Sequence, residues 1–188
     1  MDIKVPRIPR SWIIQEDSVP FTLPIPSWRK RADFGLLPAA GDGSNLGITG
    51  TLGANSPNLV GTSCNNSFAL EYARTQFVLP ECYVAGSAII LRAHAVIINA
   101  AFVSANIDVE AYVSTKDTGT TGDLVTTVAQ ALSVNVWADE DFDIAGAGLV
   151  AGDLFDLKIG LLVTDNGGGM PPCQAFIGDT RMMLSIKG

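Results

Sequence analysis

Charged side chains are scarce in this chain of 188 residues, where Asp, Glu, Lys and Arg together make up 16% of the sequence. An average soluble protein carries about 25%. Hydrophobic residues account for 47%. A chain with few charges and many apolar residues is expected to have part of its surface covered, either by copies of itself or by a protein partner.

Long apolar runs are also lacking. The longest run, residues 95–105, is interrupted by Asn99 and Ser104, whereas a membrane-spanning helix needs about 20 apolar residues. Near the N-terminus, Arg7 and Arg10 stand among prolines, where a signal peptide would have an apolar segment. The sequence therefore predicts no membrane partner and no export signal.

Cysteine and histidine are few. Cys64, Cys82 and Cys173 lie far apart with no CxxC pair, which argues against a disulfide framework and predicts buried free thiols in a reducing compartment. A site with three cysteine ligands to a metal is the less favoured interpretation. His94 is the single histidine, and no sequence motif offers it a catalytic partner. We expect no cofactor, no metal site, no catalytic residue and no enzymatic activity.

Seven of the ten prolines fall in residues 1–57, which end in a stretch rich in Gly, Asn and Ser. Proline excludes a helix interior and a central strand, yet this segment is too rich in aromatic and aliphatic residues for a disordered linker. We therefore predict an extended N-terminal arm, residues 1–57, that lies along a partner surface. Its predicted aromatic anchors are Trp12, Phe21, Trp28 and Phe34.

Charge divides the chain unevenly. Residues 1–33 carry six basic and four acidic side chains, a net charge of +2, and the remainder carries six basic and fifteen acidic ones, a net charge of −9. Because binding to nucleic acid depends on neutralising phosphates, we expect no specific nucleic-acid partner. The basic cluster Arg29, Lys30 and Arg31 follows Trp28 and predicts docking into an acidic groove of a protein. Contact of this cluster with packaged DNA is the alternative.

Apolar residues recur at every second position from about residue 67 onwards, as in half-buried strands. In residues 68–73, for example, Phe, Leu and Tyr alternate with Ala, Glu and Ala. No stretch has the pattern of a capped amphipathic helix. We predict an all-β, eight-stranded jelly-roll sandwich over residues 58–188; an immunoglobulin-like sandwich is the alternative, although its cysteine–tryptophan spacing is missing. The expected strands are 68–73, 87–98, 107–113, 124–136, 142–144, 155–163, 174–177 and 182–186.

Four acidic residues crowd into positions 139–143, and we expect residues 138–141 to form a loop. Clustered carboxylates suit calcium, but the alternating spacing and the glycine of a calcium loop are absent. The favoured interpretation is a solvated loop or a charged rim that faces a basic partner.

The plan of the chain resembles the jelly-roll head-decoration, or cement, proteins of tailed bacteriophages. The resemblance consists of the proline-rich arm, the segment from Leu149 to Leu157 and the ending on a strand at Ile186-Lys187-Gly188. It implies a virion structural protein on the capsid exterior, assembled in the host cytoplasm. Such proteins form homotrimers that clamp the neighbouring major capsid proteins, and they have no catalytic residues.

Two other functions remain open from the sequence. The first is a receptor-binding or tail-fibre domain, or a trimeric lectin-like jelly roll. Such a domain is expected to have exposed aromatic residues on the loops of the sandwich. Trp137 is the one such candidate. The second is the capsid protein of a small virus, whose arm would be more basic in order to hold the genome.

Overall fold

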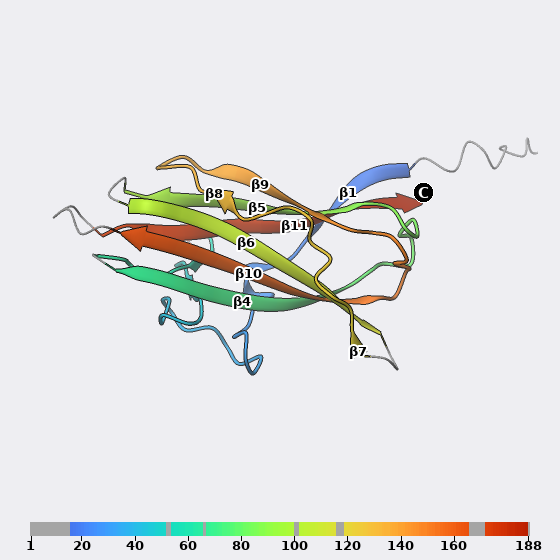
Figure 1. Cartoon of the computed structure of the whole chain (residues 1–188), viewed down its shortest axis with the longest axis horizontal. Helices are drawn as coiled ribbons and strands as arrows, with labels where there is room; N and C mark the ends of the chain where they lie inside the picture. The colour runs from blue at the N-terminus through green and yellow to red at the C-terminus, as the bar shows by residue number, and fades with distance from the viewer. Residues whose placement is uncertain are drawn as a thin grey trace, which may run out of the picture.

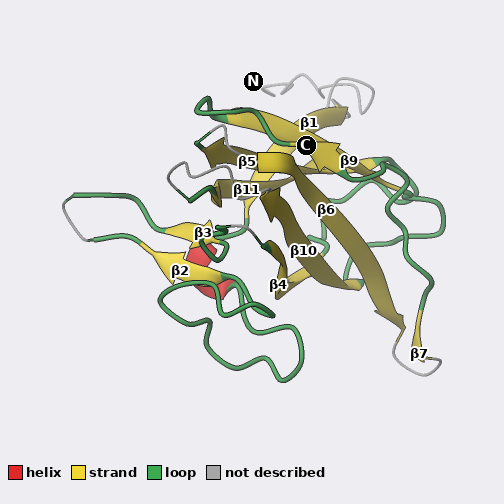
Figure 2. Ribbon diagram, turned by 60° about the vertical axis from the view of Figure 1, so that its left-hand side comes forward, coloured by secondary structure: helices red, strands yellow, loops and turns green. Residues whose placement is uncertain are grey.

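A computed structural model of the chain describes residues 16–51, 54–65, 67–99, 102–115, 119–165 and 172–187. The described residues form two antiparallel sheets packed face to face (Figures 1 and 2). The strands are β1 (Glu16–Thr22), β2 (Gly47–Thr49), β3 (Asn58–Val60), β4 (Phe68–Val78), β5 (Ile89–Ile98), β6 (Phe102–Thr115), β7 (Gly119–Thr120), β8 (Gln130–Ala131), β9 (Ala138–Ile144), β10 (Leu154–Asp165) and β11 (Gln174–Lys187).

The first sheet, which we call sheet A, has the order β2-β3-β11-β5-β9, and β1 also pairs with β11. The second, sheet B, has the order β4-β10-β6-β7, and β8 also pairs with β6. The described residues thus form a sandwich of the jelly-roll kind. The predicted all-β sandwich is confirmed, with more strands than the eight expected. No helix among the described residues is long and apolar enough to cross a membrane.

Strand β10 illustrates how the sequence pattern builds the core. Phe155, Leu157 and Ile159 point into the space between the sheets and are buried, while the intervening Lys158 faces outwards. Strands β5 and β6 repeat this alternation from the two facing sheets. Because side chains alternate across a strand, each long strand contributes one row to the core and one row to the surface.

Strand β4 keeps the predicted alternation but turns the opposite face inwards. Ala69 and Ala73 are buried, whereas Phe68 is 71% exposed and Leu70 also faces solvent. Glu71 lies on the inward face and is buried, where its carboxylate accepts hydrogen bonds from the backbone of Gly43 and from Thr62. Hydrogen bonding offsets the cost of burying a carboxylate, and the small alanines leave room for the facing sheet.

The predicted separation between an arm and a domain at residues 57 and 58 needs correction. Strand β1 pairs with β11 along its whole length, and β2 pairs with β3 across the proposed boundary, with Thr49 opposite Asn58. Pro20 lies within β1, which pairs with β11 alone among the described strands. A proline is tolerated on such an edge because its missing N–H would face away from the ladder. Strands β1 and β2, which lie within the predicted arm, therefore belong to the sandwich.

Trp28, predicted to anchor a partner, is fully buried in the core of this chain. The short 3₁₀ turn Ile25–Ser27, with prolines at its start, carries the chain from β1 to this position. The indole Nε1 donates to Thr180 Oγ1 at 3.2 Å, and that hydroxyl donates to the carbonyl of Leu23 at 2.9 Å. Trp28 is therefore a core residue and cannot act as an exposed anchor.

Candidate functional site

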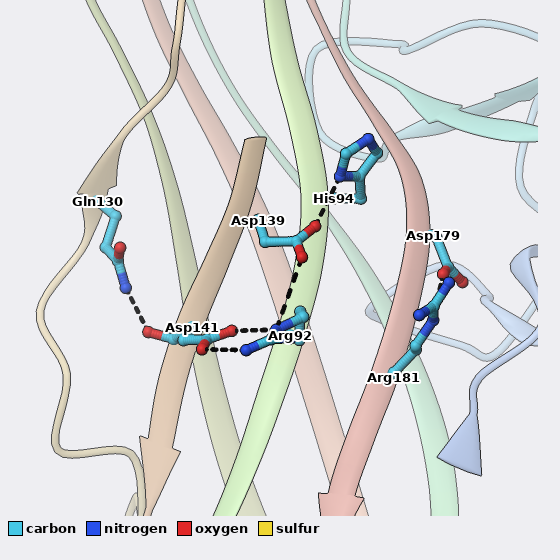
Figure 3. A network of polar contacts seen from close by, with 7 residues as sticks. All are labelled: Arg92, His94, Gln130, Asp139, Asp141, Asp179 and Arg181. Atoms are coloured by element: carbon cyan, nitrogen blue, oxygen red, sulfur yellow. Dashed lines mark hydrogen bonds and ion pairs between the residues drawn. The ribbon is translucent and has the colours of Figure 1, made fainter. Parts of the chain in front are cut away.

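A polar network covers the outer face of sheet A, where β9, β5 and β11 run side by side (Figure 3). The strand register places His94 between Asp139 and Asp179, and in the next row Arg92 lies between Asp141 and Arg181. These side chains come from the outward positions of strands whose inward positions fill the core. The alternation of the strands thus creates a surface of closely spaced donors and acceptors.

The contacts hold these side chains in place. His94 Nδ1 lies 2.6 Å from Asp139 Oδ1, and Arg92 donates to both carboxylate oxygens of Asp141 at 2.7 Å. Arg181 Nε lies 2.5 Å from Asp179 Oδ2. The hydrogen bonds from Arg92 lower the pKa of Asp141 and outweigh its partial burial, which would raise that pKa. Asp141 is therefore an anion at neutral pH.

Trp137 is the aromatic residue of this face. It immediately precedes β9, is 40% exposed, and stacks on His94 with a ring-centroid separation of 5.4 Å and an interplanar angle of 11°. Gly178 makes room for the indole, because a Cβ atom there would lie 3.0 Å from Trp137 Cζ3. Gly178 also lies at the irregularity in the β11 register between Ile177 and Asp179.

Two hollows lie on this face, and Trp137 lines one of them. One, of about 250 Å³, is lined by Arg92, His94, Asp139, Asp179 and Arg181. The other, of about 330 Å³, is lined by Asn55, Ser56, Asn58, His94, Trp137, Gly178 and Asp179. Because His94 and Asp179 line both, the hollows adjoin each other across the sheet. Together they offer an aromatic surface flanked by polar side chains, the combination that ligand sites use.

The acidic run at residues 139–143 is not a loop, which corrects the prediction. It lies in β9, and its outward carboxylates at 139 and 141 face Arg92 and His94 of the neighbouring strand. Among the described residues, no group of three or more His, Cys, Asp or Glu side chains is arranged to hold a metal ion. The acidic run is part of the charge network of sheet A.

The other predicted anchors that the structure describes, Phe21 and Phe34, make their ring contacts outside this network. Phe21 packs edge-on against Phe77, with ring centroids 6.2 Å apart, and is half-buried. Phe34 lies under the guanidinium of Arg74, at 4.4 Å. Trp12 lies outside the described residues. Whether Phe21 or Phe34 contacts a partner stays a prediction.

The basic cluster divides into three different environments. Arg29 forms backbone bridges to β4 and donates from its side chain to the carbonyl of Trp28 at 2.8 Å. Lys30 is half-buried, and Arg31 is exposed above the ring of Tyr72 on the outer face of sheet B. The three side chains therefore do not form one continuous patch for docking.

Parts of the sheet A site are recognisable in the sequence, but the sequence does not bring them together. Trp137 is the one exposed aromatic candidate for a lectin-like domain, whereas His94 has no catalytic partner in any motif and the acidic run is expected to begin in a loop. The signal that could have joined them is the alternation of Arg92 and His94 in one strand and Asp139 and Asp141 in another, since cross-strand pairs of opposite charge favour pairing.

Comparison with known proteins shows the fold of this chain. No protein-family model matches the sequence, and no curated protein matches it. The xylan-binding CBM22-1 domain of Xyn10C from Paenibacillus barcinonensis has a TM-score of 0.50 and 8% identity over 93% of this chain and 99% of its own length. The xylan-binding module CBM15 has a TM-score of 0.46 and 16% identity over 91% of this chain and 99% of its own length.

A third solved structure, TmCBM61 in complex with β-1,4-galactotriose, has a TM-score of 0.41 and 10% identity over 77% of this chain and 86% of its own length. At 8% identity, the likeness to the CBM22-1 domain shows a shared fold alone, and it agrees with the jelly-roll sandwich seen in the strand order. None of these three structures is a phage head protein, and the resemblance to decoration proteins stays a prediction. The expected absence of catalysis likewise stays a prediction.

Proposed function

We propose that this chain is a carbohydrate-binding domain whose ligand lies across β9, β5 and β11 on the outer face of sheet A. The observation that carries the proposal is Trp137, a half-exposed indole that stacks on His94 and lines one of two adjoining hollows. A large aromatic side chain left at the surface beside hollows is a candidate contact for a ligand.

The chemistry of this face suits a sugar chain. A pyranose ring presents an apolar C–H face and a rim of hydroxyl groups, each of which can donate and accept a hydrogen bond. Trp137 supplies a flat apolar surface, while Asp179 accepts hydrogen bonds and Arg181 donates them. Two adjoining hollows give room for more than one sugar unit.

The ion pairs support the proposal because they fix the polar groups before a ligand arrives. The Arg92–Asp141 pair and the His94–Asp139 contact hold four side chains in defined conformations. A site whose side chains are already ordered loses less conformational entropy on binding. The jelly-roll fold shared with the xylan-binding CBM22-1 domain is compatible with this function, but the argument depends on the site itself, since a fold can host many functions.

The experiment is affinity electrophoresis of the purified chain against a panel of soluble polysaccharides that includes xylan and β-1,4-galactan, followed by calorimetry with oligosaccharides of any ligand found. We expect Trp137→Ala to weaken binding about 30-fold, as for loss of an aromatic anchor contributing about 2 kcal/mol. Val136→Ala is the matched control, because Val136 adjoins Trp137 in sequence, is also exposed and lines neither hollow.

Two results would contradict the proposal. One is that no polysaccharide of the panel retards the wild-type chain. The other is that Trp137→Ala binds the ligand as tightly as Val136→Ala does, which would move the site away from sheet A.

Assembly is a second candidate function, favoured by an apolar cluster on sheet B. Phe68 and Leu70 face outwards from β4, and the register places Leu162 of β10 beside Leu70. Exposed apolar clusters of this kind mark contact surfaces. The homotrimer expected from the sequence can be tested by multi-angle light scattering, in which Phe68→Ser should shift the mass towards that of a monomer; a wild-type monomer would remove this candidate.

A further inference from the structure

A separate hollow lies on the outer face of sheet B, on the opposite side of the sandwich from Trp137. Its volume is about 350 Å³, and strands β4, β6 and β10, which Figure 1 shows side by side, form its floor. It is lined by Arg31, Arg74, Glu110, Tyr112, Thr120, Asp156 and Lys158. No part of the function proposed above uses these residues.

The charges on the floor of the hollow are already paired. Arg74 forms a two-point ion pair with Asp156, and Lys158 pairs with Glu110. Burial raises the pKa of Glu110, but hydrogen bonds from Lys158 and from the Tyr112 hydroxyl outweigh it and lower the pKa overall. Two of the three cations that line the hollow are therefore neutralised by neighbours in the sheet.

Arg31 is the third cation, and it forms no ion pair with the described residues of the sheet, although its charge helps to lower the pKa of Glu110. Its guanidinium carbon lies 4.7 Å from the centre of the Tyr72 ring, on which it stacks. Among the described residues, its side chain has no hydrogen-bond or ion-pair partner. When a guanidinium stacks on an aromatic ring, its N–H groups lie in the guanidinium plane and stay accessible from the side. A carboxylate in that plane can then accept two hydrogen bonds from them.

The stacking surface under Arg31 is itself built by the sheet. A Cβ atom at position 160 would lie 2.9 Å from Cδ1 of Tyr72, so only Gly160 lets this ring lie against β10. Lys158 Nζ also lies 4.6 Å from the centre of the same ring. Tyr72 therefore supports two cations at the edge of the hollow, and Arg31 is held there by a cation–π contact.

The side chains that line the hollow carry a net positive charge. Three cations and two carboxylates line it, leaving an excess of one positive charge on a chain whose net charge is −7. An anion that enters the hollow can pair with Arg31, which forms no ion pair within the described part of the sheet. The hollow is thus the candidate site on this chain for a negatively charged group.

We infer that the hollow on sheet B is a second ligand site, which takes the carboxylate of an acidic sugar, such as a uronic acid unit, on the guanidinium of Arg31. The Tyr112 and Thr120 hydroxyls line the same space and can bond to the hydroxyl groups of the sugar ring. The hydrogen bond to Glu110 raises the pKa of Tyr112 to about 12, and Tyr112 therefore keeps its proton at neutral pH. This inference does not depend on the site at Trp137.

The test compares three probes with the intact chain by calorimetry at low ionic strength: an oligogalacturonate, a neutral xylo-oligosaccharide and inorganic sulfate. We expect the oligogalacturonate to bind and its affinity to fall about 10-fold to 100-fold in Arg31→Ala, the range for loss of a hydrogen bond to a charged group. Arg31→Lys keeps the charge but not the planar donor pair, and should give an intermediate loss.

Lys30→Ala is the matched control. It removes the same charge at the position next to Arg31, and the Lys30 side chain does not line the hollow. It should bind the oligogalacturonate as the wild type does, and so should Trp137→Ala, which separates this site from the one on sheet A. Thermal unfolding of each variant establishes that it is folded.

Three outcomes would overturn the inference. In the first, the wild type fails to bind the oligogalacturonate. In the second, Lys30→Ala weakens binding as much as Arg31→Ala, which would mean that charge alone is responsible. In the third, sulfate binds and competes as strongly as the acidic sugar, in which case the hollow takes any small oxyanion and not a uronic acid unit.

Discussion

Replacing Trp28 tests most directly whether the proline-rich segment belongs to the sandwich. Trp28 is fully buried and its indole N–H donates to Thr180. Burying a tryptophan removes 150–250 Å² from water, worth about 4–6 kcal/mol at ~25 cal/mol per Å² as an upper bound. Measured truncations of buried Phe and Trp to alanine cost about 3–5 kcal/mol, and we expect Trp28→Ala to fall in that range.

The loss should appear in urea unfolding followed by circular dichroism, with free energies extrapolated to water. For a domain of this size, about 2–4 °C is lost per kcal/mol, so the midpoint of thermal unfolding should fall by roughly 6–20 °C. Trp28→Phe keeps most of the ring but leaves the Thr180 hydroxyl without its donor, which should cost about 1–3 kcal/mol.

Leu36→Ala is the control from the same segment, because Leu36 is 76% exposed. Surface replacements of this kind change stability by about 0.5 kcal/mol or less. If Trp28→Ala unfolded at the same urea concentration as Leu36→Ala, the indole would not lie in the core, and an anchoring role for Trp28 on a partner would be restored.

Three further predictions follow from burial and pairing. Deleting residues 1–40 removes β1 and the tryptophan beneath it, so we expect an unfolded chain by circular dichroism, and a folded, cooperative product would contradict the placement of β1. The hydrogen bonds from Arg92 depress the pKa of Asp141 in the folded state, so the pair adds stability above the unfolded pKa of about 4 and loses it as the pH falls through the folded value. The thermal stability of the wild type should therefore exceed that of Asp141→Asn by more at pH 6 than at pH 2, and a constant difference would count against the pair. Burial raises the pKa of Cys64 and Cys173, so a thiol reagent at pH 8 should modify the half-buried Cys82 first and the other two only after denaturation, whereas three equal rates would show that all are accessible.

The strands of the body could be predicted from the sequence because burial imposes a period of two. The expected segment 155–163 lies within β10, and 107–113 lies within β6. The segments 174–177 and 182–186 proved to be one strand, β11, interrupted by a register shift. The expected strand at 124–136 is mostly irregular. Among the described strands it contains β8 alone, and the residues on either side of β8 make isolated bridges, Val125 to Ile144 and Val134 to Ile97.

The faces of strand β4 show what periodicity leaves undetermined. The pattern at 68–73 predicts a strand but does not determine which face is buried. From their size, Phe68 and Leu70 would be expected in the core, but in the structure they face solvent. The buried carboxylate of Glu71 bonds to backbone groups of loops distant in sequence. Such a partnership depends on the tertiary structure, which a single sequence does not reveal.

The proline-rich segment was interpreted as an arm because proline argues against central strands. Proline does exclude a strand that has neighbours on both sides, but β1 pairs on one side alone among the described strands, and Pro20 is tolerated there.

The candidate site on sheet A could not be predicted either, because it depends on which strands become neighbours. Trp137 and His94 stack only because β5 and β9 become neighbours in sheet A.

The position of β11 has a consequence for how this chain acquires its structure during synthesis. β11 is the last of the described strands to leave the ribosome, yet it lies between β5 on one side and β1 and β3 on the other. Until it emerges, β1 has no partner and the inward faces of the earlier strands stay open to water. Domains of this kind, dominated by contacts between distant residues, fold slowly, and their exposed strand edges invite aggregation. The nascent chain is therefore vulnerable until its final strand inserts. Translation that stops before residue 174 would leave β1 unpaired and would separate the β2-β3 pair from the β5-β9 pair.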